Sequence, residues 1–265
     1  MFPILLKIGP VSIHTYGFMM AVGVASALWF IFHYGKKAKL PSSKLIDMAF
    51  YTIIIALIGS KIVLLIGNFS YYKKYYSELV SLARSGGVFQ GGLAFGFFFA
   101  LWYLKKHRLP FWKTADIVGP AIALGHGFGR IGCFSAGCCF GRTCDVPWAV
   151  TFSSEYAHSL TGIPLYIPLH PTQLYESILN FTNFLILLII LKRKKFNGQI
   201  FSLYIMNYSI IRYFVEFYRG DHTEKVYLFK NASPYMRISY PQFFCILTLI
   251  AGIILYLVLK KRKGD

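Results

Sequence analysis

Runs of apolar residues constrain the fold of this chain more than any other feature. A helix needs roughly 20 residues to cross about 30 Å of hydrocarbon, and seven runs in the chain approach or exceed that length. The seven runs are residues 13–34, 45–67, 88–104, 115–134, 172–191, 200–218 and 241–259. We therefore expect an all-α membrane protein with seven transmembrane helices. The fourth has the weakest signal because of its glycines.

The composition agrees with a membrane setting. Hydrophobic residues make up 56% of the 265 residues and charged residues 14%, whereas a soluble domain carries about 25% charged residues. The net charge of +18 would suit nucleic-acid binding, but the basic residues cluster just beyond the apolar runs, as topology signals do. We therefore expect membrane lipids, and no nucleic acid, as partners. The first residues, up to Gly9, have one Lys and no small-residue cleavage site, so no removable signal peptide is expected.

The basic clusters predict how the chain lies in the membrane. With seven spans, sixteen of the 28 Lys and Arg residues fall on one side, which the positive-inside rule makes the cytoplasm. The N-terminus is then outside and the C-terminus cytoplasmic. Loops 68–86, 135–169 and 219–240 are external. Without an internal repeat or a low-complexity linker, residues 1–265 are expected to form a single membrane domain. The sixteen are Lys36, Lys37, Lys39, Lys44, Lys105, Lys106, Arg108, Lys113, residues 192–195 and residues 260–263.

The stretch Gly125–Arg142 is the first place to look for chemistry. It reads GHGFGRIGCFSAGCCFGR and combines six glycines with two arginines, a histidine and three cysteines. Glycine permits tight turns and close approach to a ligand, and arginine offers a rigid fork of donors suited to phosphate. We expect Arg130 to lie in a glycine-rich break of the fourth span, where freed backbone donors admit a lipid headgroup.

Other polar residues converge on the predicted outer side. Ionisable groups inside a membrane are costly, and they usually face the bundle interior and have a function. Arg212 and Glu216 are spaced i,i+4, so they share a helix face. The candidates are Tyr16, Gln90, Arg130, Cys133, Cys138, Arg142, His170, Gln173, Tyr175, Glu176, Arg212, Glu216 and Arg219.

Several of these residues also have a structural interpretation. The i,i+4 pair of the sixth span can be an ion pair that only holds the helix. Arg142 and Arg219 can reach anionic headgroups without further function. His126 can be a satisfied buried histidine. Asp116, near the start of the fourth span, is interpreted as a helix cap.

The cysteines leave more than one interpretation open. Five are too few for a disulfide scaffold. Cys133, Cys138, Cys139 and Cys144 read C-x4-C-C-x4-C, whereas zinc sites favour C-x2–4-C pairs, so the spacing is weak evidence for a metal. No C-x-x-C redox pair is present. An external disulfide of undetermined connectivity and simple apolar packing are the alternatives.

Taken together, these motifs resemble the prolipoprotein diacylglyceryl transferase family over nearly the whole chain. The resemblance implies a seven-helix enzyme of the bacterial inner membrane whose site opens to the outer leaflet. It implies transfer of the diacylglyceryl group of phosphatidylglycerol to the lipobox cysteine thiol of a prolipoprotein, forming a thioether and releasing glycerol phosphate. The matching pieces are HTYG at 14–17, QGGL at 90–93, ADIVGP at 115–120, GRIGCFSAGCCFGR at 129–142, HPTQLYE at 170–176 and IRYFVEFYRGD at 211–221.

The resemblance also implies roles for residues. Arg130 and Arg212 are the expected catalytic phosphate binders, because arginines that bind the leaving phosphate more tightly as its charge grows lower the barrier. Glu216 would orient Arg212, and Gly141 would permit the loop geometry. No metal or cofactor is expected. The substrates would be phosphatidylglycerol and a lipobox peptide. The protein is expected to be a monomer. The expected substrate-binding residues are Tyr16, Gln90, Cys133, Gly141, Arg142, Glu216 and Arg219.

This chain departs from the family at informative positions. The family signature usually reads G-R-x-G-N-F-x-N-x-E-x-x-G, whereas here Cys133 replaces the first Asn, Ala136 the second and Cys138 the Glu. The histidine usual in the H-G-G-L stretch is Gln90, which cannot act as a base.

His126 is our hypothesis for the missing base. It precedes Arg130 by four residues and shares its helical face if the segment is helical there. The departures also leave two other functions open. One is a non-catalytic or altered-specificity relative that keeps the phospholipid site, and the other is an external thiol redox or metal protein.

Overall fold

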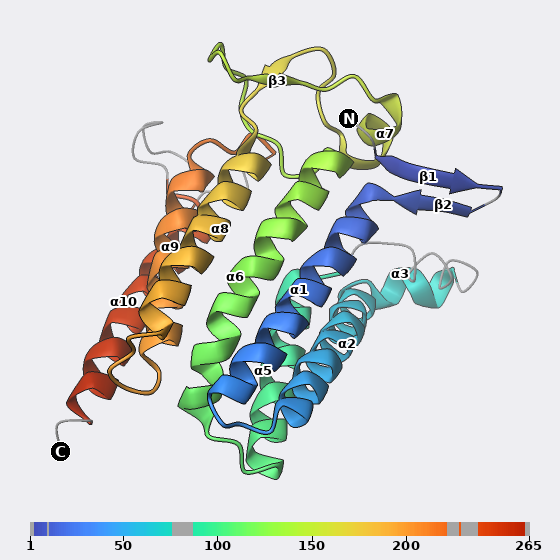
Figure 1. The fold of residues 1–265 in the computed structure, drawn as a ribbon. Helices are drawn as coiled ribbons and strands as arrows, with labels where there is room; N and C mark the ends of the chain where they lie inside the picture. The colour runs from blue at the N-terminus through green and yellow to red at the C-terminus, as the bar shows by residue number, and fades with distance from the viewer. Residues whose placement is uncertain (1–2, 10, 76–86, 222–227, 229–237, 263–265) are drawn as a thin grey trace. The chain divides into compact units, whose positions relative to one another are not determined.

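Long helices dominate the fold. The computed structural model describes residues 3–9, 11–75, 87–221, 228 and 238–262. Five helices within them, α1, α2, α6, α8 and α10, are long and apolar enough to cross a membrane. The prediction of an all-α membrane protein is confirmed at that level, and the count of seven spans stays a prediction. The described helices of 18 residues or more are α1 (Thr15–Lys37), α2 (Ser42–Gly67), α5 (Phe89–Lys106), α6 (Phe111–Ala136), α8 (Thr172–Leu191), α9 (Gln199–Glu216) and α10 (Tyr240–Lys261) (Figure 1).

Short elements join or precede these helices. The described residues include α3 (Phe69–Lys74) and α7 (Glu155–Thr161), together with two antiparallel strand pairs. Strand β1 (Ile4–Ile8) pairs with β2 (Val11–His14), and β3 (Val150–Thr151) pairs with β4 (Pro168–Leu169). The apolar runs do not predict these strands, because the strands have at most five residues and a run that spans a membrane needs roughly 20.

The segment between α6 and α8, predicted as a long external loop, has a small core of its own. Helix α7 and the strands β3 and β4 lie within it (Figure 1). Ser154 caps α7 by accepting a hydrogen bond from the backbone of Ala157. The segment is therefore a folded cap on the helices. Its buried residues are Phe152, Ala157, Ile163 and Leu169, packed against Phe134, Phe140 and Val150.

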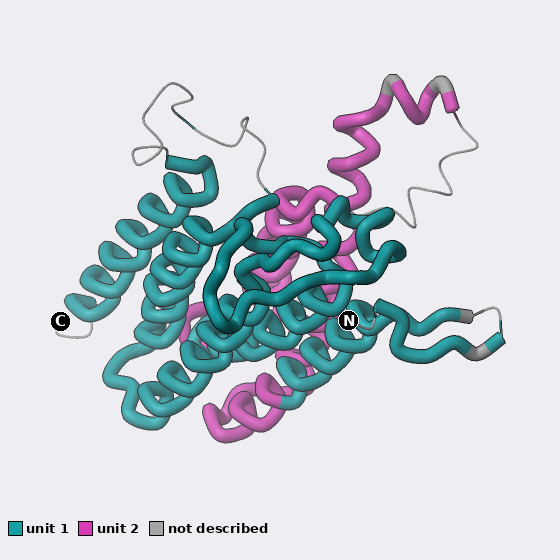
Figure 2. Tube along the Cα trace, turned by 90° about the horizontal axis from the view of Figure 1, so that it is seen from above, with its two compact units in different colours: residues 1–29, 115–265 teal, residues 30–114 magenta. Residues whose placement is uncertain are grey.

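The chain divides into two compact units (Figure 2). Unit 1 comprises residues 1–29 and 115–265, and unit 2 comprises residues 30–114. In unit 2, α2 packs along α5, and a Cβ added at Gly59 would lie 2.4 Å from the side chain of Phe95. That helix pair therefore needs a residue without a side chain at the crossing. The expectation of a single domain stays a prediction.

Unit 1 holds the helices that carry most of the candidate residues. Helix α9 packs along α10 and against α8. The part of α1 that belongs to this unit approaches α6 closely, since a Cβ on Gly23 would lie 2.9 Å from the carbonyl oxygen of Gly125. Small residues that let helices approach are typical of membrane helix packing.

A buried carboxylate on α6 fixes the start of α9. The side chain of Asp116 is 0% exposed. Its oxygens accept hydrogen bonds from the backbone N–H groups of Gly198, Ile200 and Phe201, at 2.8, 2.9 and 3.1 Å. Lys194 Nζ lies 3.2 Å from Asp116 Oδ2. The interpretation of Asp116 as a cap is correct in kind but wrong in place, because it caps α9 instead of its own helix. A helix N-terminus attracts negative charge.

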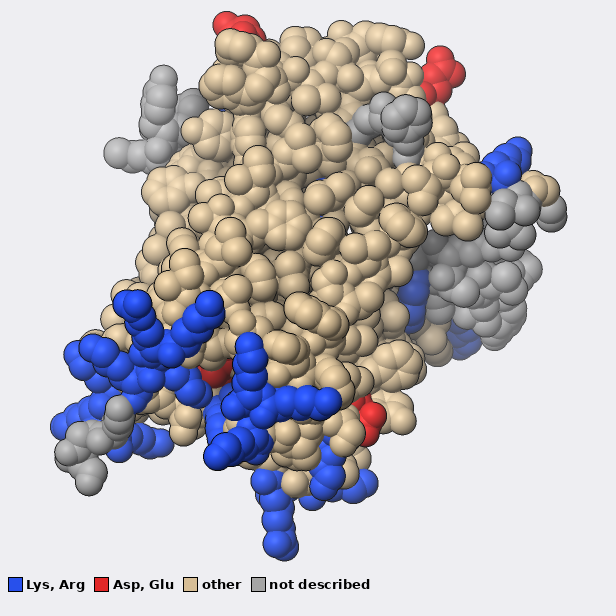
Figure 3. Space-filling view, in the orientation of Figure 1, with Lys and Arg blue, Asp and Glu red and all other residues tan. Residues whose placement is uncertain are grey.

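Basic residues gather at one end of unit 1. Helix α8 is followed by residues 192–195, all basic, and α10 ends in Lys260 and Lys261. The space-filling view shows Lys and Arg clustered where these two helices end (Figure 3). This grouping contains two of the four basic clusters from which the cytoplasmic side is predicted.

Candidate functional site

A histidine, an arginine and a glutamate form a buried ionic cluster between α6 and α8. Arg130 Nη2 lies 2.8 Å from Glu176 Oε2, and His126 Nε2 lies 3.3 Å from Glu176 Oε1. Arg130 Nε also donates a hydrogen bond of 3.3 Å to His126 Nε2. The Glu176 side chain is 1% exposed and that of Arg130 12%, so protein groups balance these charges with little help from water.

Helix α6 runs without a break past Arg130 to its last residue. The prediction that Arg130 lies in a glycine-rich break is therefore wrong. The glycines serve close packing, since a Cβ on Gly127 would lie 2.7 Å from the ring of Phe181. A Cβ on Gly132 would lie 3.3 Å from the ring of Tyr16. Because α6 is helical here, the i,i+4 spacing does put the predicted histidine on the face of Arg130.

Glu176 is the residue whose importance the sequence underestimates. From the sequence, Glu176 is one of several polar residues on the predicted outer side, without a role of its own. The available signal was an acidic group inside an apolar run, which is costly unless it is paired. The cationic partner, Arg130, comes from another helix, so spacing along the chain does not reveal it.

A second buried ion pair lies on α9. Arg212 Nη2 is 2.7 Å from Glu216 Oε2, and the two side chains are 15% and 2% exposed. Glu216 Oε1 also accepts a hydrogen bond of 3.0 Å from Ser239 Oγ. Ser239 in turn forms a capping box with Gln242 at the start of α10. The predicted i,i+4 pair is thus present, and α10 helps to hold its carboxylate.

The helices that carry Arg130 and Arg212 touch each other within unit 1. The ring of Tyr208, on α9, lies 5.4 Å from the ring of His126, centroid to centroid. His126 and Tyr208 each lie four residues before an arginine on their own helix, so this ring contact places the part of α6 that carries Arg130 next to the part of α9 that carries Arg212. Binding of phosphate by Arg130 and Arg212 stays a prediction.

Tyr16 belongs to the same neighbourhood. It lies in the first turn of α1, and a side chain at Gly132 would meet its ring at 3.3 Å. Arg130 and Cys133 both act on its phenol electrostatically. Tyr16 is 42% exposed.

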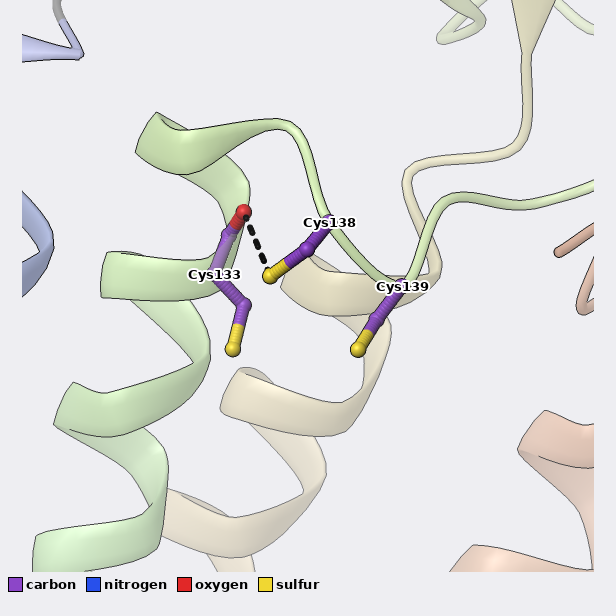
Figure 4. Close-up of side chains that lie close together, drawn as sticks. All are labelled: Cys133, Cys138 and Cys139. Carbon is purple, nitrogen blue, oxygen red and sulfur yellow. Dashed lines mark hydrogen bonds between the residues drawn. The ribbon is translucent and has the colours of Figure 1, made fainter. Parts of the chain in front are cut away.

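Three cysteine thiols lie close together at the end of α6 and in the turn that follows it (Figure 4). We call Cys133, Cys138 and Cys139 the thiol cluster, because their Sγ atoms all lie within 4.8 Å of one another. All five cysteines lie in the described part of the chain and carry free thiols, so no disulfide is formed among them. Hydrogen bonds from the other two thiols hold the pKa of Cys139 below its ordinary value against the effect of burial, and Arg219 and Arg130 act in the same direction.

Gly141, Arg142 and Arg219 form a tight backbone crossing. The N–H of Gly141 donates to the carbonyl of His170 at 3.1 Å, and Arg142 Nε donates to the carbonyl of Arg219 at 3.1 Å. A Cβ on Gly141 would lie 2.3 Å from the oxygen of His170, so only glycine fits there. Arg219 also forms an ion pair with Asp221 through Nε at 2.8 Å. Arg219 therefore already has a carboxylate partner within the protein, whether or not it also reaches a lipid headgroup.

Some buried polar atoms on α8 and α9, the helices that carry Glu176 and Arg212, have no partner in the described part of the chain. Among the described residues, Arg212 Nη1, Gln173 Oε1 and Asn180 Oδ1 are buried and make no hydrogen bond. Buried polar groups are nearly always satisfied, and an exception needs an explanation such as a missing ligand or water. An anion with both acceptor oxygens and a hydroxyl group, such as a glycerol phosphate head, would suit this mixture.

Comparison with known proteins identifies the family of this chain. The model of the prolipoprotein diacylglyceryl transferase family matches residues 3–258. The chain belongs to this family. A "Phosphatidylglycerol--prolipoprotein diacylglyceryl transferase" of Clostridium tetani is 33% identical over 98% of this chain and 99% of its own. A relative of the same name from Finegoldia magna is 32% identical, covering 96% and 95%. "Phosphatidylglycerol--prolipoprotein diacylglyceryl transferase 2" of Clostridium perfringens is 33% identical, covering 98% and 96%.

Two departures from the transferase signature now have a structural setting. The thiol cluster includes the signature positions Cys133 and Cys138, so two sulfurs stand where the transferase pattern usually has an amide and a carboxylate, and Cys139 adds a third sulfur next to them. Gln90, which replaces the usual histidine, is exposed near the start of α5 and belongs to unit 2. Its contact with substrate stays a prediction.

Proposed function

We propose that this chain transfers the diacylglyceryl group of phosphatidylglycerol to the lipobox cysteine thiol of a prolipoprotein, forming a thioether and releasing glycerol phosphate. The observation that carries the proposal is the pair of largely buried arginines, Arg130 on α6 and Arg212 on α9, each held by a buried glutamate on helices that touch through the rings of His126 and Tyr208. The relatives' printed names support these substrates.

The arginines supply the charge that the reaction needs. When the thiolate sulfur attacks the glyceryl carbon, the carbon–oxygen bond to phosphate breaks and the leaving group gains negative charge. A guanidinium group stays protonated at any relevant pH and binds phosphate in a forked geometry. Arg212 Nη1 is a buried donor without a partner among the described residues, and it is well suited to bind a phosphate oxygen. Such donors lower the barrier when they stabilise the charge that develops in the transition state.

His126 is the proposed base, and its contacts suggest how it is held ready. In the structure Arg130 Nε donates to His126 Nε2, so the lone pair of that nitrogen is occupied. When Arg130 turns its donors to a phosphate, Nε2 is released to accept the thiol proton. The imidazolium that forms would be stabilised by Glu176 Oε1, which lies 3.3 Å away. Binding of the headgroup and activation of the thiol are thereby coupled.

The other predicted residues are proposed to contact or position the substrates. Glu216 orients Arg212 through their ion pair. Gly141 permits the backbone crossing that holds Arg142 against Arg219. The residues proposed to bind substrate are Tyr16, Gln90, Cys133, Gly141, Arg142, Glu216 and Arg219.

We further propose a seven-span protein of the bacterial cytoplasmic membrane with an external N-terminus and a cytoplasmic C-terminus, acting as a monomer. Seven described helices have at least 18 residues, and the shortest of these, about 27 Å long at 1.5 Å per residue, approaches the thickness of the hydrocarbon. The basic residues that follow α8 and α10 support the orientation (Figure 3). The predicted external loops 68–86 and 219–240 lie partly outside the described residues.

The test is an assay of the purified protein with phosphatidylglycerol and a lipobox peptide, read as the mass shift of the peptide. Arg130→Ala and Arg212→Ala should each lower the rate by about 100-fold or more, the usual cost of removing a donor that stabilises transition-state charge. Arg193→Ala is the matched control, because Arg193 is an exposed arginine in the basic segment after α8.

Two results would contradict the proposal. A wild-type protein that binds phosphatidylglycerol vesicles but never modifies the peptide would favour the non-catalytic relative. If the Arg130→Ala variant reacts as fast as the Arg193→Ala variant, Arg130 has no part in the mechanism.

A further inference from the structure

The thiol cluster has the spacing of a metal site. The Sγ atoms of Cys133, Cys138 and Cys139 lie within 4.8 Å of one another, and all three face a common space (Figure 4). Three sulfurs bound tetrahedrally to one zinc ion at about 2.3 Å lie about 3.8 Å apart. Small side-chain rotations would therefore close the cluster around an ion.

The backbone holds these sulfurs in place. The chain turns back after α6 with two residues in the left-handed region, Gly137 at φ 78° and Cys139 at φ 61°. That conformation is uncommon for a residue other than glycine. The side chains of Thr172 and Gln173, at the start of α8, donate to the carbonyls of Cys139 and Cys138, each at 2.8 Å. The turn is thus fixed from a second helix, and it directs two adjacent cysteines back over Cys133.

We propose that the thiol cluster binds one Zn²⁺ ion through three thiolates, and that its fourth position takes the lipobox thiol of the substrate. Thiolates are the preferred ligands of zinc, and a catalytic zinc keeps an open position for water or substrate. Three protein thiolates and Zn²⁺ carry a net charge of −1, which Arg130, one turn before Cys133 on α6, and Arg219, whose backbone pairs with that of Gly141, would offset. This inference rests on the proposed function only for the identity of the fourth ligand.

The location suits the chemistry of the transfer. A thiol that coordinates a divalent metal is deprotonated, so the substrate would be bound as the thiolate that the reaction needs. Cys133 and Arg130 lie one turn apart on α6, which puts a metal-bound sulfur beside the proposed phosphate site. The lipobox sulfur forms a bond to the glyceryl carbon, and the carbon–oxygen bond breaks. Its electron pair leaves with the phosphate, and the thiol proton passes to His126.

Metal binding is tested first, without activity. The full-length protein is purified in detergent under reducing conditions, freed of metal with a chelator, and titrated with Zn²⁺ and with Co²⁺, whose thiolate complexes absorb in the near ultraviolet. We expect one ion per chain in the wild type. Cys133→Ala, Cys138→Ala and Cys139→Ala should each lose the sulfur-to-cobalt band. The matched control Cys245→Ala removes a buried thiol on α10, outside the cluster, and should keep the band.

The substrate arm uses two lipobox peptides that differ only in Cys or Ser at the acceptor position. Adding the cysteine peptide to the Co²⁺ protein should intensify and shift its bands as a fourth thiolate binds, and the serine peptide should leave them unchanged. Removing the metal should lower the transfer rate at least tenfold, and Zn²⁺ should restore it.

The outcomes separate the two proposals. Failure of the wild type to bind a metal ion, or a band that survives in the three cluster variants, overturns the metal site and leaves the transferase assignment standing. If the sulfur-to-cobalt band does not change when the cysteine peptide is added, or if the metal-free protein is fully active, the proposed role of the fourth position is overturned. A Co²⁺ protein with the expected band that never modifies the peptide overturns the transferase proposal and supports the metal site alone.

Discussion

Replacing Glu176 by Gln should destabilise the protein strongly, because this carboxylate balances Arg130 inside the helices. The oxygen and nitrogen of the pair are 2.8 Å apart, and the side chains are 1% and 12% exposed. Coulomb's law at that distance with an effective dielectric constant of about 20 gives an attraction of about 6 kcal/mol. Desolvation opposes this attraction, and removing one partner of a buried pair costs about 3–5 kcal/mol. We expect Glu176→Gln to cost about 3 kcal/mol of unfolding free energy, since the amide keeps one hydrogen-bond acceptor.

The assay is equilibrium unfolding in mixed detergent micelles, followed by helical circular dichroism. Glu155→Gln is the control, because Glu155 is an exposed glutamate in the first turn of α7. Its replacement should change stability by no more than about 0.5 kcal/mol. A difference between the two variants then reports burial and pairing rather than the loss of a carboxylate as such.

A double-mutant cycle separates the ion pair from other effects. Arg130→Met alone leaves Glu176 buried beside a neutral side chain and should also destabilise. The double variant, Glu176→Gln with Arg130→Met, has no uncompensated charge, so its cost should fall short of the sum of the two single costs by about 2–3 kcal/mol. Transferase activity should stay low in the double variant, because the phosphate-binding guanidinium is missing. Additive costs, or a Glu176→Gln variant as stable as Glu155→Gln, would refute the assigned pairing.

The remaining predictions concern one backbone contact, one helix cap and one base. Gly141→Ala should cost about 1–3 kcal/mol, because its Cβ would lie 2.3 Å from the oxygen of His170; Gly67→Ala, where a Cβ meets nothing within 4 Å, should be nearly neutral in the same unfolding assay. Asp116→Ala should cost at least the roughly 1–2 kcal/mol of a lost cap, and exchange of the amide hydrogens at the start of α9 should speed up. His126→Ala should slow the peptide mass-shift reaction by about 100-fold or more, as expected for a general base; a wild-type rate would remove His126 from the mechanism.

Local patterns in the sequence predict the helices well. The fifth apolar run, residues 172–191, coincides with α8, because Pro171 precedes it and four basic residues follow it. The fourth run begins at residue 115 in the prediction, whereas α6 begins at Phe111. The difference arises because Lys113 and Thr114 lower the hydropathy of a turn that is nevertheless helical. Hydropathy therefore predicts the apolar part of a helix and is less reliable for its polar ends.

Contacts between distant residues explain what the sequence could not predict. Glycines near Arg130 suggest a break when the chain is read alone, but whether a neighbouring helix presses against each glycine depends on the tertiary fold. The Arg212–Glu216 pair was predictable, because four residues separate the two on one helix. The pairing of Arg130 with Glu176 and the capping of α9 by Asp116 join segments far apart in sequence. No spacing rule contains that information.

The balance of charge explains how such a site can stay in a membrane and still favour the reaction. Arg130 and Arg212 each face a carboxylate of their own, so the two pairs are neutral overall before substrate arrives. An arginine has five donors, and a carboxylate occupies only some of them, so a phosphate can bind without displacing either glutamate. The phosphodiester of the lipid carries one negative charge and the departing glycerol phosphate carries nearly two. In the proposed mechanism the attraction to both guanidinium groups grows as that second charge develops, so the arginines would bind the transition state more tightly than the substrate, which is the condition for lowering the barrier.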